Sequence, residues 1–149
     1  MLKLRTADWV HNGHMSDRVT SKTGPEDSGN ADYERGRALL ESGDFVRAAA
    51  AFEASVSRWP HFKSLELLGE AFMRVGEPQR AIVPLAAATT LNAQVRAPSL
   101  LAEALLSIGD RLKAHEIAKL ALSREPNNKR AKAVFDQTKA DHDARMNPL

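Results

Sequence analysis

A turn that begins with glycine recurs three times in this chain at a constant spacing of 33 residues, at positions 43, 76 and 109. The turns are Gly43-Asp44, Gly76-Glu77 and Gly109-Asp110, and an alanine follows each glycine five positions later, at Ala48, Ala81 and Ala114. Self-similarity at this period is typical of one helical supersecondary unit that is copied and stacked on itself. The sequence therefore predicts a helical repeat array, which offers an extended concave surface and no ready-made catalytic cleft.

Composition favours one domain with a surface of mixed charge. The 149 residues can bury one core, and because only 5% of them are aromatic, alanine and leucine must do most of the packing. The formal net charge of +2 is small, which argues against nucleic acid as a partner. No cysteine is available for a disulfide or a metal site. No apolar run reaches the roughly 20 residues of a membrane span, so we predict a cytoplasmic protein.

The first thirty residues do not share the repeat pattern. Between residues 16 and 30 the only large apolar residue is Val19, so burial cannot offset the entropy of ordering, and we predict a flexible segment over 1–30. Met15 follows His14 as an ordinary protein start would follow vector-derived sequence, which is one interpretation of residues 1–14. The alternative is that four apolar side chains of this stretch dock on the first repeat: Leu2, Leu4, Trp9 and Val10.

A helical periodicity starts at about Ala31 and continues through three units, at about 31–61, 62–94 and 95–126. In the second half of the first unit, apolar residues recur at the three- and four-residue spacing of a helix packed on one face: Phe45, Ala48, Ala49, Phe52 and Val56. Residues 127–149 predict a capping helix and tail, with Ala131, Val134, Phe135 and Thr138 on one side. Asp32 and Arg35 give the first helix the polar outer edge that an N-terminal repeat needs.

Together these positions resemble the tetratricopeptide repeat family. A unit of that family has a small residue early in helix A, a large apolar residue late in it, a Gly-Asp turn, and then alanine, a large apolar residue, alanine and proline in helix B. Unit one matches at Gly36, Leu39, Gly43, Asp44, Phe45, Ala48, Phe52 and Pro60, with Ser55 in place of an alanine. Unit two matches at Leu68, Gly69, Phe72, Gly76, Ala81, Leu85 and Ala88, with Glu77 and Ala93 as departures. Unit three matches at Leu101, Gly109, Asp110, Ala114, Ala121 and Pro126, with Ala102 and Ala118 as departures.

The resemblance implies an all-α fold: a right-handed α-α superhelix of three helix-turn-helix units plus a C-terminal capping helix. Close crossing of helices A and B needs small residues at the contact, and we expect Gly36, Gly69 and Ala102 to face Ala48, Ala81 and Ala114. In the family, ligands lie along the concave face formed by the A helices. The resemblance thus implies partner-binding residues on that face: Tyr33, Arg37, Leu40, Glu66, Glu70, Met73, Arg74, Arg96, Ser99 and Glu103.

The family's clamp for chaperone tails is not reproduced on this face. The positions of its lysine, asparagine and arginine residues hold Tyr33, Arg37, Leu67, Arg96 and Leu100 here, so Arg96 alone corresponds. The mixture of charged and apolar side chains instead favours an amphipathic or mixed-charge peptide. The alternative is that the charges form surface pairs within one helix, such as Glu70 with Arg74, that contribute only about 0.2–0.5 kcal/mol each.

We therefore predict a non-enzymatic protein-protein interaction module, a scaffold, adaptor or co-chaperone-like protein that binds a peptide or partner helix in its concave groove. The alternative is a self-associating module that stacks through its solenoid ends into a homo-oligomer. No catalytic motif, cofactor site or metal site is predicted. The histidines at positions 11 and 14 have no third ligand nearby, and those at 61, 115 and 142 are far apart in the sequence, so solvated histidines are expected.

Overall fold

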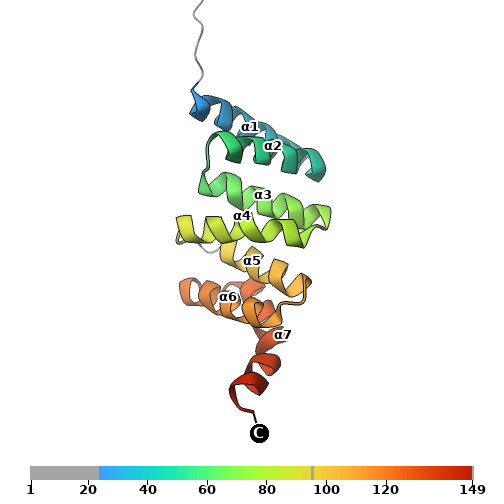
Figure 1. Ribbon diagram of the computed structural model, residues 1–149, viewed down its shortest axis with the longest axis vertical. Helices are drawn as coiled ribbons and strands as arrows, with labels where there is room; N and C mark the ends of the chain where they lie inside the picture. Colours follow the sequence, from blue (N-terminus) through green and yellow to red (C-terminus); the bar gives the residue numbers. More distant parts are fainter. Residues whose placement is uncertain (1–23, 95, 149) are drawn as a thin grey trace, which may run out of the picture.

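The computed structural model describes residues 24–94 and 96–148, which form seven α-helices and no strand. The helices are α1 (Pro25–Glu41), α2 (Phe45–Arg58), α3 (Phe62–Val75), α4 (Pro78–Leu91), α5 (Arg96–Ser107), α6 (Arg111–Arg124) and α7 (Lys129–Met146). They follow one another along the long axis of the molecule (Figure 1), so the predicted helical repeat superhelix is confirmed. Both interpretations of residues 1–14 concern a part of the chain outside the described residues.

Glycine ends the first helix of every unit because each turn needs a left-handed backbone. The φ angles are 83° at Gly43, 85° at Gly76 and 86° at Gly109. Only glycine adopts this conformation without steric cost. Aspartate in the next position then caps the second helix: the carboxylates of Asp44 and Asp110 accept hydrogen bonds of 3.2 Å from the backbone N–H groups of Arg47 and Lys113. Glu77 makes no such cap, and a proline at N1 of α4 leaves one fewer N–H to satisfy.

Helix α1 begins at Pro25, six residues before the boundary expected at Ala31. The part of the flexible segment that was predicted for residues 25–30 is therefore helical. The reason lies in contacts distant in sequence: Gly29 is buried where a Cβ atom would stand 2.7 Å from Cβ of Trp59, and Ser55 Oγ donates a 2.8 Å hydrogen bond to the Gly29 carbonyl oxygen. The small polar residues of this stretch are helical because α2 packs against them.

In the first two units, helices A and B cross with a small residue of helix A against a large residue of helix B. A Cβ atom added to Gly36 would lie 2.7 Å from the Phe52 ring, and one added to Gly69 would lie 2.3 Å from Cγ of Leu85. The nearest neighbours of these glycines are thus the large residues of helix B, and the expectation that they face the alanines Ala48 and Ala81 is corrected.

The third unit solves the same crossing differently. The residues at the corresponding positions are Ala102 and Ala118, and both are fully buried. In this unit helix A has alanine in place of glycine, and helix B has alanine in place of a large residue. The extra Cβ atom on helix A is therefore accommodated by a smaller side chain on helix B. This pairing accounts for two departures from the family pattern that looked independent in the sequence.

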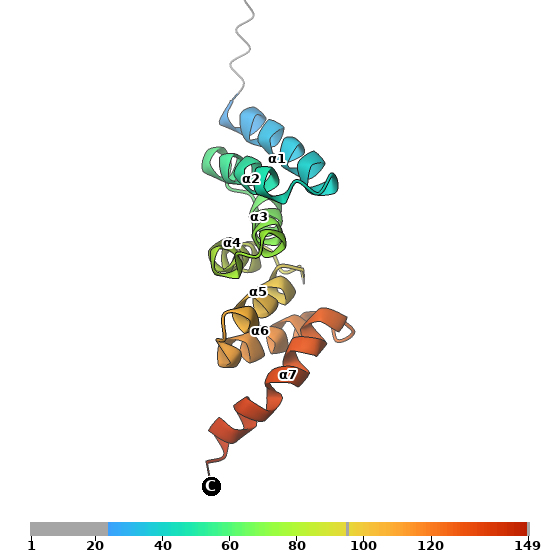
Figure 2. The same ribbon diagram turned by 90° about the vertical axis from the view of Figure 1, so that its right-hand side faces the viewer.

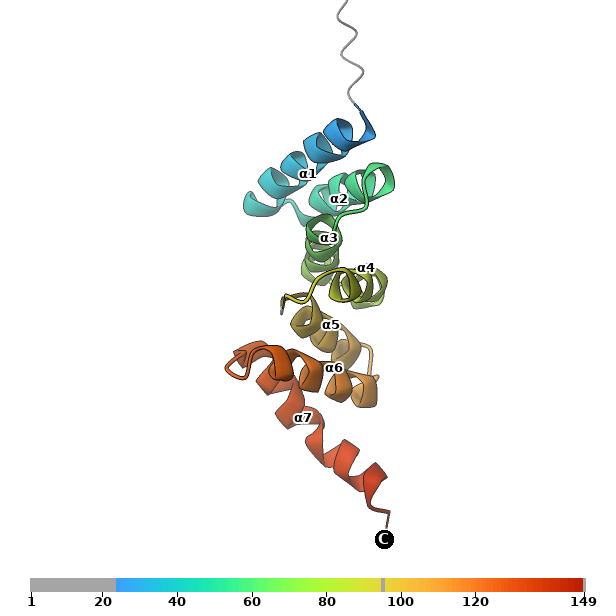
Figure 3. The same cartoon turned by 90° about the vertical axis from the view of Figure 1, so that its left-hand side faces the viewer.

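The odd-numbered helices form the inner side of the stack. The backbones of α1 and α3, of α3 and α5, and of α5 and α7 approach closely, whereas within residues 24–94 and 96–148 those of α2 and α4 and of α4 and α6 do not. Only a long side chain spans α2 and α4, through the 2.8 Å ion pair between Glu53 and Arg80. Alternate helices whose backbones approach closely must lie on the tighter side of a curved array, and the others lie on the wider side. Figures 2 and 3 show α2 and α4 displaced to one side of α1, α3 and α5. The concave face therefore belongs to α1, α3 and α5.

The two ends of the described array are formed by α1 and α7. At the first helix Arg35 is exposed, but Asp32 turns inward and its carboxylate lies 3.3 Å from Nη1 of Arg58, with 16% of the Asp32 side chain exposed. At the other end α7 packs on α6 and α5 with the side predicted from its sequence, burying Ala131, Val134 and Thr138.

Candidate functional site

The predicted partner-binding residues all lie on the helices of the concave face. Tyr33, Arg37 and Leu40 are on α1; Glu66, Glu70, Met73 and Arg74 are on α3; Arg96, Ser99 and Glu103 are on α5. They are spread along the face and do not converge on one point, which suits an extended ligand better than a small molecule.

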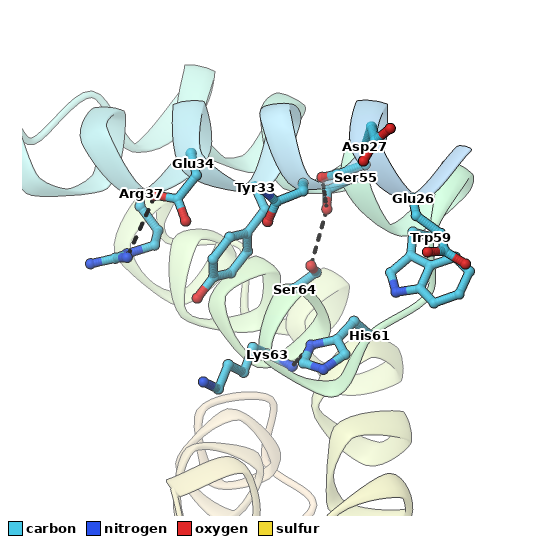
Figure 4. Close-up of a pocket in the computed structure, with 12 residues that line it drawn as sticks. Glu26, Asp27, Tyr33, Glu34, Arg37, Ser55, Trp59, His61, Lys63 and Ser64 are labelled. Atoms are coloured by element: carbon cyan, nitrogen blue, oxygen red, sulfur yellow. Dashed lines mark hydrogen bonds and ion pairs between the residues drawn. The ribbon is translucent and has the colours of Figure 1, made fainter. Parts of the chain in front are cut away.

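A pocket of about 530 Å³ opens at the N-terminal end of this face, between α1 and α3 (Figure 4). Its walls include Tyr33 and Arg37 from α1, Trp59 and His61 from the segment that links α2 to α3, and Lys63 from α3. Of these residues, sequence reasoning predicted Tyr33 and Arg37 as partner-binding residues and missed Trp59 and His61. They follow the last turn of α2, and only the path of the connecting segment brings them to the concave side.

The floor of this pocket is a chain of hydroxyl groups. Ser55 Oγ gives its proton to the Gly29 carbonyl oxygen, so the 3.0 Å contact with Ser64 Oγ must have Ser64 as the donor. Ser55 stands where the family pattern has alanine. Its two hydrogen bonds link α1, α2 and α3 beneath the pocket, which accounts for a hydroxyl group at this position. Figure 4 shows both serines between Tyr33 and Trp59.

Two carboxylates in the middle of the face share one arginine. Arg96 Nη1 lies 3.4 Å from Glu66 Oε1, and Arg96 Nη2 donates to Glu70 Oε2. The bridge joins α5 to α3, so Glu70 does not pair with Arg74 within its own helix as one interpretation of the sequence held. Arg96 is also the single residue that corresponds to the family's clamp for chaperone tails, and here it is already engaged by carboxylates of the same chain.

Burial makes Glu66 dependent on this bridge. Desolvation raises the pKa of the Glu66 carboxyl above its usual value, the neighbouring carboxylate of Glu70 raises it further, and the charge of Arg96 opposes both effects. A carboxyl group with a raised pKa in the folded protein stabilises the fold most at low pH, and that contribution is lost as the pH rises through the folded pKa.

Replacing Arg96 with methionine is expected to lower the free energy of unfolding by about 1–3 kcal/mol at pH 7.5, because Glu66 is left without its charged partner. The loss should shrink toward pH 4.5, where a protonated Glu66 no longer needs the arginine. Denaturant titrations of both proteins at the two pH values check this. Exposed Arg47 replaced with methionine is the control and should show no comparable pH dependence. An equal loss at both pH values would contradict the role given to Glu66.

The last predicted residues on α5 are also committed to contacts within the chain. Ser99 is buried, and its hydroxyl donates a 2.9 Å hydrogen bond to the Arg96 carbonyl oxygen of the same helix. Glu103 Oε1 lies 3.1 Å from Nε of Arg130, which comes from α7 and was not predicted. Burial raises the pKa of the Glu103 carboxyl, while Arg130 opposes this. This end of the face is therefore closed by α7.

The open part of the face lies over α1 and α3. Leu40 and Met73 are half-buried and pack against the core with one side. Arg74 is exposed and stands 5.3 Å above the Phe45 ring. Arg37 forms exposed ion pairs of 3.5 and 3.7 Å with Glu34 and Glu41. Such exposed pairs contribute little and leave the guanidinium available.

Lys63 and Arg74 are the cations of this face that have no ion pair within the described residues. The carboxylates of Glu66 and Glu70 are held by Arg96, whose single positive charge offsets one of their two negative charges. Lys63 and Arg74 are therefore the cations of this face that an incoming acidic side chain can pair with, although Glu26, Asp27 and Glu34 also line the pocket beside Lys63. Sequence reasoning could not separate these two residues from Arg96, because all three are exposed basic residues on A helices.

His115 and His142 differ from the expectation of solvated side chains, whereas His61 is exposed as expected. His115 is buried, and its ring stacks on that of His142 with 4.3 Å between the ring centres. In the part of the chain that the structure describes, no group of three or more histidine, cysteine, aspartate or glutamate residues is arranged to hold a metal ion. His11 and His14 lie outside it. None of the seven described helices is both long enough and apolar enough to cross a membrane.

Comparison with known proteins identifies the repeat. A family model described as tetratricopeptide repeat matches residues 33–96, which covers the first two units and the start of the third. No curated protein matches the sequence. The match shows that residues 33–96 carry the tetratricopeptide repeat that the residue pattern predicted, and the whole described array has the fold of such repeats.

Solved structures of this family share the fold at low sequence identity. The first tetratricopeptide domain of Spaghetti (RPAP3), bound to the HSP90 peptide SRMEEVD, is 18% identical, with a TM-score of 0.72 over 78% of this chain and 94% of that one. The OM64 domain of Arabidopsis is 19% identical, with a TM-score of 0.73 over 79% and 99%. The Yersinia enterocolitica type III secretion chaperone SycD, in complex with a peptide of the translocator YopD, is 20% identical, with a TM-score of 0.69 over 77% and 95%.

Proposed function

We propose that this protein is a non-enzymatic interaction module that binds an extended peptide or a partner helix on the concave face of α1 and α3. The observation that carries the proposal is the pocket of about 530 Å³ between these helices, which the unpaired cation Lys63 lines. The unpaired cation Arg74 and the half-buried Leu40 and Met73 lie farther along the same two helices. The complexes of the first RPAP3 domain with an HSP90 peptide and of SycD with a YopD peptide support a peptide as the ligand class.

The arrangement favours a partner with both acidic and apolar side chains. Acidic groups would be attracted to Lys63 and Arg74, and apolar groups would cover Leu40, Met73 and the Tyr33 ring. The chaperone-tail clamp is not part of the proposal, because Arg96 is bound by Glu66 and Glu70. The contacts come from rigid helices, so binding requires little reorganisation of the face.

Replacing Lys63 with glutamate is expected to weaken peptide binding about tenfold or more, since a repulsion of about 1.4 kcal/mol corresponds to a factor of ten in Kd. Peptides selected from a random display library on the full chain supply the ligands, and fluorescence anisotropy gives the Kd values. Stability should be retained, because position 63 lies in the first turn of α3, where negative charge is favourable.

The matched control is Lys119 replaced with glutamate on the convex helix α6. Lys119 is also exposed and also has no ion pair within the described residues. Its replacement should leave the Kd within twofold. Equal weakening by both substitutions would show that binding is unspecific attraction to positive charge, and a loss confined to the Lys119 variant would place the partner on the convex side.

A further inference from the structure

One cluster of titratable side chains lies away from the proposed peptide site, where α7 docks on α6. His115 of α6 has 3% of its surface exposed. Its ring lies 4.4 Å from the ring of Phe135 and 4.3 Å from that of His142, with interplanar angles of 26° and 21°. Phe135 and His142 are separated by seven residues, or about 10.5 Å along α7, so the His115 ring is held between them.

The hydrogen bonds of this cluster fix the tautomer of the neutral His115 ring. The hydroxyl proton of Thr138 goes to the Val134 carbonyl oxygen at 2.8 Å, so Thr138 Oγ1 accepts the 3.0 Å hydrogen bond from His115 Nδ1–H. Nε2 is then the nitrogen left to take a second proton. A protonated His115 ring would be charged but without hydration, and it would stack on a second imidazole, that of His142.

The charged groups around His115 do not offer it a counter-ion. Those that face it are Glu116 and Lys119 on α6 and His142 and Asp143 on α7. Glu116 Oε1 lies 3.2 Å from Nε2 of His142 and thus pairs with that ring instead. No carboxylate of the described residues lies within 4.0 Å of a His115 ring nitrogen. Burial, followed by the charge on His142, lowers the pKa of the His115 imidazole below its usual value.

We propose that the docking of the C-terminal helix α7 on α6 is controlled by pH: neutral His115 is part of the docked interface, and its protonation releases α7. The direction follows from linkage. The docked state binds a proton on His115 more weakly than the undocked state, so acid shifts the equilibrium toward undocking. Docking is fully stable above the ordinary histidine pKa of about 6.5 and weakens as the pH falls below it, by at most about tenfold per pH unit for one proton.

The last described helix can respond in this way without unfolding of the other described helices. In a repeat array each helix depends only on its neighbours, and among the helices that the structure describes α7 contacts α5 and α6. Undocking would also break the ion pair between Arg130 and Glu103. The proposal does not require a peptide to bind, because the interface of α7 with α6 and the proposed peptide site on α1 and α3 are different surfaces.

Hydrogen-exchange mass spectrometry of the full chain, as protection factors corrected for intrinsic exchange, tests the proposal. Between pH 7.5 and 5.5 the protection of α7 should fall several-fold, while that of α3 stays constant. The replacement of His115 with phenylalanine keeps the ring stack and removes the titration of His115, so the acid-induced loss of protection in α7 should disappear. His61→Asn, which retains a side chain able to cap α3, is the control and should behave as the wild type.

Proton NMR of the wild-type histidine rings gives a second measurement that does not depend on how well the variant folds. The His115 resonance should titrate at the midpoint at which α7 loses protection. Constant protection of α7 in the wild type would overturn the proposal. So would an unchanged pH dependence in the His115→Phe protein, or a His115 titration that does not coincide with the loss.

Discussion

Replacing Phe52 with alanine should lower the free energy of unfolding by about 3–5 kcal/mol. Phe52 is fully buried, and its ring fills the space left by Gly36 on α1 and lies 6.1 Å from the ring of Tyr33. The helices on both sides are held by other contacts, so they cannot collapse into the cavity completely. Removing the ring therefore costs both its burial and the contacts of its surroundings.

Denaturant unfolding with the m-value determined for each protein checks this effect. The matched control is Val46 replaced with alanine on the same helix, because Val46 is 67% exposed and should change stability by less than about 0.5 kcal/mol. If the Phe52 variant lost less than about 1 kcal/mol, the crossing of α1 and α2 would have to be more adaptable than its packing indicates.

Replacing Gly69 with alanine should destabilise the protein by about 1–3 kcal/mol, although alanine is the better helix former. The added Cβ atom would stand 2.3 Å from Cγ of Leu85, which is fully buried, so the two helices must separate or Leu85 must leave its rotamer. The affected atom is in the middle of the side chain, and a rotation of the terminal methyl groups alone does not relieve the contact.

A double-mutant cycle with Leu85 gives this prediction a strict test. Leu85→Ala alone should cost about 2–5 kcal/mol, because it opens a cavity. Combining it with Gly69→Ala should cost less than the sum of the two, since the new methyl group enters that cavity. The combined variant reproduces the Ala102 and Ala118 pair of unit three. Additive costs would show that Gly69 and Leu85 do not share one contact.

Much of the fold could be predicted from the sequence, because the sequence signals that specify it are local. Every 33 residues a glycine in the left-handed conformation ends a helix. In two of these turns the next residue, Asp44 or Asp110, caps the following helix. These effects depend on the backbone within one turn, so they hold before any tertiary contact is known. The spacing of apolar residues in α2 and α7 also predicted which sides of those helices would be buried.

Local signals also misled at one boundary. Residues 25–30 contain proline, two acidic residues, serine, glycine and asparagine, a composition that favours disorder when read alone. Ser55 and Trp59, which lie nearly thirty residues away, make this stretch the first turns of α1. Tertiary contacts with α2 stabilise this helical stretch, and the sequence close to residue 28 does not contain the residues that make them.

The sequence by itself determined the repeat and its turns, because a strict period repeats one set of local interactions three times, and the resemblance to the family implied which helices share the concave face. Only the tertiary structure decided which charges of that face are free. Arg96, Lys63 and Arg74 are equivalent as exposed basic residues in a sequence, but Arg96 reaches Glu66 and Glu70 across the junction of two units. The structure likewise brought His115 of α6 between Phe135 and His142 of α7. Such pairings depend on side-chain rotamers and on how closely helices of different units approach, and neither is set by periodicity.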